Sequence, residues 1–152
     1  MMENQTQYQF VIQACQQLLT EVKCDFVGLA FQHTNGPDIG WHFAVGNRND
    51  KYKRIVVRYG KGIAGRVIST GRPMTVERFP SQILGKPNEY PIMLAEKLIS
   101  SYAVPIFNQK GIPKGVLLIG QREAHLFNES QQSLVSQVAN QIETFLGGLV
   151  DF

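Results

Sequence analysis

The sequence is poor in the residues on which much protein chemistry depends. Among its 152 residues are two cysteines, Cys15 and Cys24, and three histidines. Two cysteines provide neither a disulfide framework nor a recognised zinc spacing. The histidines, His33, His42 and His125, are scattered along the chain and lack a paired carboxylate. We therefore expect no metal site and no catalytic triad.

Long apolar runs and a targeting segment are also missing. No apolar run approaches the roughly 18 residues of a membrane-spanning helix. The first residues, MMENQTQYQF, lack the basic-then-apolar layout of a secretory signal. We therefore expect a cytoplasmic protein without a membrane partner. The chain is 43% hydrophobic, which excludes intrinsic disorder, and its length fits a single domain over residues 1–152.

Acidic residues are scarce in one part of the chain. The net charge is +3, and the excess comes mainly from a basic stretch made of Lys51, Lys53, Arg54, Arg58, Lys61 and Arg66, with Arg72 just beyond. Such a stretch can attract phosphates or anionic partners. No helix-turn-helix, RNA-recognition or zinc signature accompanies it, so we do not expect a nucleic-acid partner.

The hydrophobic pattern predicts an α+β domain with an antiparallel sheet. Apolar residues recur at spacings of three and four near both ends of the chain, which predicts helices over 5–22 and from Glu129 to about Leu146. Asn128 and Gln131 have the spacing of a helix cap at the start of the second one. Period-two patterns and turn residues predict strands over 24–33, 39–46, 52–59, 74–76, 102–107 and 115–121.

Two short helices are expected between the strands. One runs over 63–69 and ends at Gly71, and the other starts at Pro91, where a proline costs no hydrogen bond. We expect the first and last helices to lie together on one face of the sheet. The irregular residues 77–90 would then cover the other face and close a pocket.

The order of these elements and the residues around the first short helix resemble a GAF domain. The resemblance rests on Gly62-Ile63-Ala64-Gly65-Arg66-Val67, Gly71-Arg72-Pro73, Ala103-Val104-Pro105-Ile106 and Gly115-Val116-Leu117. It spans nearly the whole chain. GAF domains are small-molecule sensors with a ligand cavity on one face of an antiparallel sheet, and their ligands range from cyclic nucleotides to small ions. The resemblance therefore implies the fold but not the ligand.

Further residues resemble the nitrate receptors of the Nre nitrate-sensing system, a family of free-standing GAF proteins. They are Gly40-Trp41, Gly46-Asn47, Tyr52-Lys53-Arg54-Ile55 and Tyr90-Pro91-Ile92. In that family the receptor inhibits a sensor histidine kinase of a two-component system, and nitrate relieves the inhibition. The resemblance implies nitrate as the ligand, with no other cofactor, and a histidine kinase as the partner. The nitrate contacts carried over are Trp41, Ile63, Ala64, Tyr90, Pro91 and Ile92.

The residues themselves fit a small flat anion. A helix N-terminus offers free amides and a partial positive charge, and the two short helices bring two such termini. On this interpretation Gly62 caps the first helix, which leaves the amides of Ile63, Ala64 and Gly65 free, and Pro91 starts the second, which leaves those of Ile92 and Met93 free. Apolar walls would come from Trp41, Ile63, Val67 and Ile92. Neutral walls disfavour the strongly hydrated sulfate and phosphate.

Two other function classes remain open from the sequence. The first is a GAF domain for another small organic metabolite, or a free methionine sulfoxide reductase, although neither Cys15 nor Cys24 falls in the loops over the expected pocket. The second is an interaction module. The chain ends in an apolar segment with Phe145, Leu146, Leu149, Val150 and Phe152, which could pair with a second copy in a homodimer.

Overall fold

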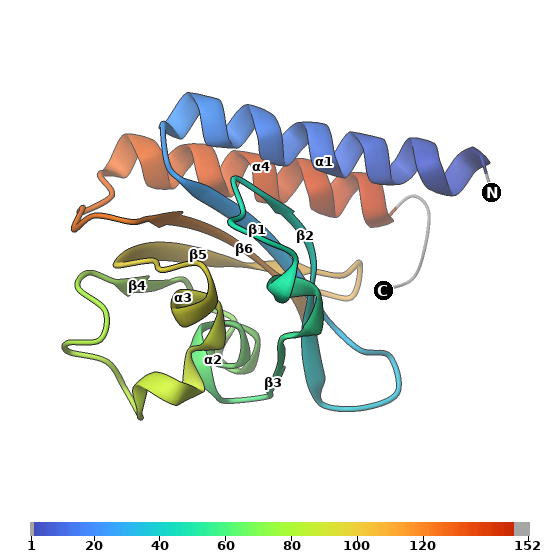
Figure 1. The fold of residues 1–152 in the computed structure, drawn as a ribbon. Helices are drawn as coiled ribbons and strands as arrows, with labels where there is room; N and C mark the ends of the chain where they lie inside the picture. Colours follow the sequence, from blue (N-terminus) through green and yellow to red (C-terminus); the bar gives the residue numbers. More distant parts are fainter. Residues whose placement is uncertain (1, 148–152) are drawn as a thin grey trace.

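Six antiparallel strands form one sheet with helices on both faces (Figure 1). The structure, a computed structural model, describes residues 2–147, with side chains from residue 8. The strands run in the order β3-β2-β1-β6-β5-β4. Their bounds are β1 Phe26–Gln32, β2 Asp38–Val45, β3 Val56–Arg58, β4 Met74–Val76, β5 Ser100–Phe107 and β6 Pro113–Gln121. The predicted α+β fold with its antiparallel sheet is confirmed.

Two long helices cover one face of the sheet, which we call the helix face. They are α1, Met2–Val22, and α4, Glu129–Gly147, and they lie side by side along the sheet (Figure 1). The predicted cap of α4 forms, because the Gln131 amide donates to Asn128 Oδ1 at 2.8 Å and the Asn128 amide to Gln131 Oε1 at 3.0 Å. The helices and sheet enclose a helix-face core of Val11, Ala14, Cys15, Leu18, Val22, Cys24, Val27, Leu29, Tyr102, Val104, Ile106, Leu117, Ile119, Phe127, Val135, Val138, Ala139 and Ile142.

Short helices and irregular segments cover the opposite face, which we call the loop face. The α-helices are α2, Gly62–Thr70, and α3, Pro91–Ala95, and the two 3-10 helices are η1, Lys51–Arg54, and η2, Pro87–Glu89. α2 ends at Gly71, whose left-handed φ of 67° matches the predicted helix stop. Figure 1 shows α2 and α3 beneath the sheet, on the side away from α1 and α4. Phe79 and the half-buried Ile83 pack into this core, so residues 77–90 cover the face as expected.

A bulge in β2 decides which face receives the single tryptophan. Leu29 of β1 pairs with Phe43, but the next residue, Ala30, pairs with Trp41, so His42 is the extra residue. An extra residue shifts the alternation of side chains by one position. Trp41 therefore packs in the loop-face core, whereas Phe43 packs against the helix-face core. The continuous period of two predicted over 39–46 is wrong at this point.

The third predicted strand is also too long. Its first half is the 3-10 helix η1, and only Val56–Arg58 pair with β2. The pattern misled because the buried Tyr52 belongs to the 3-10 turn rather than to an extended strand. The apolar C-terminal residues Leu149, Val150 and Phe152 lie outside the described residues.

Candidate functional site

The residues predicted to contact the ligand come together on the loop face. Six of them are at most 3% exposed and belong to the same core: Trp41, Ile63, Ala64, Val67, Tyr90 and Ile92. The seventh, Pro91, is half-buried and is the first residue of α3. Three segments that are distant in sequence, β2, α2 and the start of α3, thus supply one cluster.

A close backbone approach joins the start of α2 to the start of α3. A Cβ on Gly62 would lie 2.4 Å from the Glu89 carbonyl oxygen, so a larger residue does not fit there. Gly62 also has a φ of +61°, a conformation that disfavours side chains. The glycine therefore allows the first turn of α2 to pack directly against Glu89 and Tyr90.

The first turn of α2 leaves backbone donors free. Ile63 and Ala64 are buried residues of this turn, which has no intrahelical acceptor for their amides, and the structure gives them no other acceptor within residues 2–147. The prediction of a free Gly65 amide is wrong, because Lys61 rather than Gly62 is the N-cap residue, and its carbonyl accepts the first hydrogen bond of the helix from Gly65. Lys61 precedes the helix and provides no side-chain cap. Buried amides in native proteins are nearly always hydrogen-bonded to protein or to water. The free amides of this buried turn are therefore the feature of the loop face that indicates a ligand-binding site.

The start of α3 differs from its prediction in one respect. The Met93 amide is not free, because it donates to the Tyr90 carbonyl at 3.1 Å, and the Leu94 amide shares that acceptor at 3.2 Å. The first turn tightens because α3 has only five residues. Among the described residues, the Ile92 amide is the one donor that this short turn leaves without an acceptor.

A side-chain bridge connects α2 to the segment that precedes α3. Arg66 Nη1 donates to Tyr90 Oη at 2.9 Å, and Tyr90 Oη donates to the Leu84 carbonyl at 2.6 Å. Burial raises the pKa of Tyr90, against the opposing effect of the Arg66 charge and the Leu84 hydrogen bond. The hydroxyl therefore keeps its proton at neutral pH and serves as donor to Leu84.

Glu89 places a carboxylate next to this region. Its Oε1 accepts from the Lys86 amide at 3.2 Å, and its Oε2 lies 3.9 Å from Lys61 Nζ. Lys61 is exposed, so this ion pair contributes little to stability. The pair nevertheless offsets a negative charge close to the free amides of α2.

A buried carboxylate anchors the far end of α3. Glu96 is fully buried, and its Oε1 accepts from Arg122 Nη2 at 2.8 Å and from the Arg48 amide at 2.7 Å. Arg122 Nε also donates to the Glu96 carbonyl at 2.9 Å. Because Arg48 follows β2 and Arg122 follows β6, these bonds fix the C-terminal end of α3 to the sheet.

The two cysteines lie on the other side of the sheet from these residues. Both belong to the helix-face core, where burial raises the pKa of Cys15 to about 12 and that of Cys24 to about 11. Neither thiol ionises near neutral pH, so neither provides a nucleophile. Within the described residues, no group of three or more His, Cys, Asp or Glu side chains is placed to hold a metal ion.

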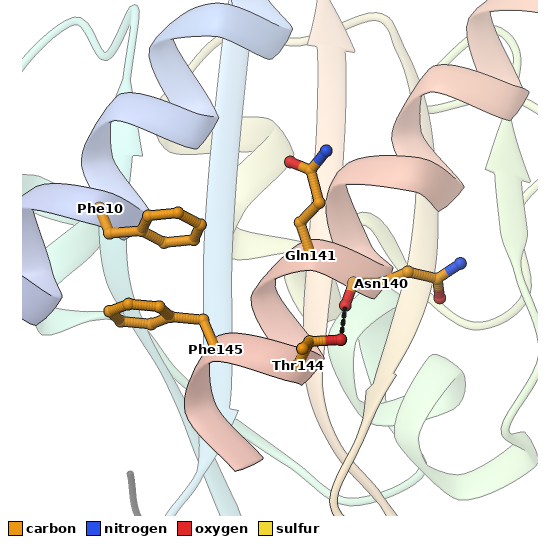
Figure 2. Close-up of a pocket in the computed structure, with 5 residues that line it drawn as sticks. All are labelled: Phe10, Asn140, Gln141, Thr144 and Phe145. Atoms are coloured by element: carbon orange, nitrogen blue, oxygen red, sulfur yellow. Dashed lines mark hydrogen bonds between the residues drawn. The ribbon is translucent and has the colours of Figure 1, made fainter. Parts of the chain in front are cut away.

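A hollow of about 410 Å³ lies on the outside of the two long helices. Figure 2 shows its walls, which are Phe10 of α1 and Asn140, Gln141, Thr144 and Phe145 of α4. The Phe10 and Phe145 rings stack with their centroids 4.1 Å apart. The walls contain no titratable side chain, so this hollow offers no acid, base or nucleophile.

Sequence reasoning missed several residues that shape the site. The sequence places Arg66 in a basic stretch and in the GAF-like segment 62–67, and Tyr90 among the contact residues, but it does not pair the two side chains. The spacing of Gly62 signalled a tight turn, but the approach to Glu89 depends on a segment far along the chain. The sequence does not indicate that Glu96 is buried, because a glutamate next to Lys97 is typical of an exposed surface.

A GAF domain model matches residues 5–146. The chain belongs to the GAF domain family. The domain is 32% identical to an NreA protein from Staphylococcus aureus mutated in its nitrate-binding site, with 83% of this chain and 93% of that one covered and a TM-score of 0.70. It is 35% identical to a hypothetical protein from S. aureus, with coverage of 78% and 97% and a TM-score of 0.69.

Other GAF structures share the fold alone. A free methionine-R-sulfoxide reductase from Neisseria meningitidis is 17% identical, with coverage of 89% of this chain and 74% of that one and a TM-score of 0.72. No curated protein sequence matches the chain. The family and the likeness to NreA indicate a small-ligand sensor.

In the described part of the chain, no helix combines the length and the apolar character needed to cross a lipid bilayer.

Proposed function

We propose that this GAF domain is a nitrate receptor that binds the ion reversibly, without a catalysed reaction, and passes the signal to a sensor histidine kinase. The observation that carries the proposal is the buried first turn of α2, with free amides at Ile63 and Ala64. The 32% identity to an NreA protein with a nitrate-binding site supports the choice of ligand.

The chemistry of the turn suits nitrate. The free amides of α2 carry the positive end of the helix dipole, and Ile92, whose amide is also free, belongs to the same core. Trp41, Val67 and Ile92 give apolar walls that fit a flat, weakly hydrated anion. Sulfate and phosphate lose more hydration on burial, so such walls select against them.

The signal would reach the kinase through residues 77–90, the segment that covers the loop face. Tyr90 belongs to the proposed contacts and is continuous with this segment, whose residues are mostly exposed. If nitrate binds the ordered arrangement better than an open one, it shifts the population toward a single surface. A kinase that recognises that surface would then respond to nitrate.

Calorimetric titration tests the ligand. Purified protein should release or absorb heat with nitrate, saturating near one ion per chain, and give no saturable heat with chloride, sulfate or phosphate. Trp41→Phe should weaken nitrate binding about three- to tenfold, since it removes an indole N–H and part of one wall. Phe43→Leu is the matched control, because the bulge puts Phe43 on the helix face.

Two results would contradict the proposal. One is the absence of heat with nitrate from protein that is folded and free of bound ligand. The other is equal weakening by Trp41→Phe and Phe43→Leu, which would locate the effect in stability rather than in the site. In either case native mass spectrometry of the protein as purified would identify an organic ligand held by the same face.

A further inference from the structure

Arg66 occupies an unusual place between the free amides of α2 and the segment that covers them. It lies one turn after Gly62, and its Nη1 donates to the Gly62 carbonyl at 3.3 Å as well as to Tyr90 Oη at 2.9 Å. The guanidinium carbon lies 5.8 Å from the centre of the Tyr90 ring. The side chain is therefore held along the first turn of the helix and over the tyrosine.

This arrangement leaves the arginine charge without a carboxylate. None of the ion pairs among the described residues involves Arg66. A half-buried arginine on a helix surface usually finds a carboxylate or extends into solvent. Arg66 instead donates hydrogen bonds to a neutral hydroxyl and a backbone carbonyl. These contacts indicate that its role is to position Tyr90 against α2.

The hydrogen bonds through Tyr90 form a chain across three segments. Arg66 of α2 binds the Tyr90 hydroxyl, and that hydroxyl binds the Leu84 carbonyl in the covering segment. The side chain of Leu84 is exposed, so its backbone is attached here by a polar contact rather than by packing. Breaking the chain at the hydroxyl releases both ends at once.

We propose that Arg66 is a positioning residue of the anion site, and that the Arg66–Tyr90–Leu84 chain is a latch that holds residues 84–90 onto α2. The latch sets the spacing between the free amides of Ile63 and Ala64 and that of Ile92. The Arg66 charge also lies beside an anion bound to that turn. This inference rests on the proposed function for its ligand, but the latch itself exists without one.

A double-mutant cycle in nitrate affinity tests the latch. Arg66→Met and Tyr90→Phe should each weaken nitrate binding about tenfold, the effect of one lost hydrogen bond to a charged group, and the double variant should be no weaker than the worse single variant. Arg72→Met is the control, because it removes an exposed charge just past the other end of α2. Additive losses would overturn the latch.

Arg66→Lys separates position from charge. A lysine keeps the positive charge, but its side chain ends one bond short of Arg66 Nη1, the atom that donates to both Gly62 and Tyr90, and it has no planar group to lie over the Tyr90 ring. Affinity close to that of Arg66→Met supports the latch, and affinity close to wild type overturns it, since charge alone would then account for the role. Thermal unfolding of each variant identifies any that fails to fold.

Hydrogen exchange measured without nitrate tests the latch independently of the proposed nitrate binding. The amides of residues 84–90 should exchange about tenfold faster in Arg66→Met and Tyr90→Phe than in wild type or Arg72→Met. Unchanged exchange would overturn the latch whatever the ligand. Faster exchange in a protein that gives no heat with nitrate would retain the latch and refute the nitrate receptor.

Discussion

The two faces of the sheet are built in different ways. The helix face is covered by two long helices, and the polar side-chain groups of its core are two protonated thiols and the Tyr102 hydroxyl. The loop face is covered by helices of nine and five residues joined by irregular segments. It holds free amides, a buried tyrosine hydroxyl bound to Arg66, and the fully buried Glu96.

The different construction of the two faces suggests that the helix face mainly provides stability and the loop face mainly provides ligand recognition. Burial of apolar side chains under long helices supplies most of the folding free energy. Short covering segments have few such contacts of their own, so they are the parts that open most readily. Polar groups without partners reduce stability but give a ligand something to bind. We therefore expect substitutions on the two faces to separate these properties.

The largest expected effect is on the helix face. Leu18 is fully buried in the helix-face core, and Leu18→Ala should lower the free energy of unfolding by about 3 kcal/mol through lost burial and a residual cavity. Nitrate affinity measured on the folded protein should stay within about twofold of wild type, a change of about 0.4 kcal/mol. Urea denaturation and calorimetry measure the two quantities. A large loss of affinity with little loss of stability would mean that the faces are not independent.

A smaller effect on stability and a larger one on binding are expected at Gly62. Gly62→Ala should cost about 2 kcal/mol, since it combines a positive φ with a clash against the Glu89 carbonyl. The clash pushes residues 84–90 away from α2, so nitrate affinity should fall at least about tenfold. The same two measurements test this variant.

Gly60→Ala is the matched control for Gly62→Ala. Gly60 also has a positive φ, +84°, but no atom lies within 4 Å of the Cβ that would be added. It should show the cost of backbone strain, about 1 kcal/mol, with affinity near wild type. If both variants lose affinity equally, strain in the turn and not the contact with Glu89 controls the site.

The regular parts of this fold could be predicted from the sequence because their signals are local. The cap residues Asn128 and Gln131 and the stop at Gly71 act within one turn of chain, and all formed as expected. For the residues of β2 that follow Trp41, the side of the sheet on which each side chain lies could not be predicted. The bulge at His42 depends on how β2 pairs with β1, and the sequence of β2 alone does not determine that pairing.

The candidate site was predictable in its members but not in its geometry. The resemblance to a known family brought Trp41, Ile63 and Tyr90 into one hypothesis, and the fold does place them in one core. The contacts that set their spacing join residues more than 20 positions apart, as Arg66 and Tyr90 do. Glu96 escaped because a buried charge is recognised only by its partners, and these come from other parts of the chain.

The smallest expected effect tests the inertness of the helix face. The pKa of Cys15 is about 12 in the folded protein against an ordinary value of 9.0, because burial penalises the thiolate. Above pH 9 the unfolded chain loses this proton while the folded chain keeps it, so stability falls as pH rises toward 12. At pH 10 the loss from this thiol should be about 1.4 kcal/mol, and at pH 8 it should be negligible.

Urea denaturation of wild type and Cys15→Ala at pH 8 and pH 10 isolates this contribution, since tyrosines and lysines titrate alike in both. The variant should lose less stability between the two pH values, whatever its stability at pH 8. Equal losses would mean that Cys15 ionises in the folded protein as easily as in the unfolded one. A reactive thiolate would then be available on α1, contrary to the expectation from burial.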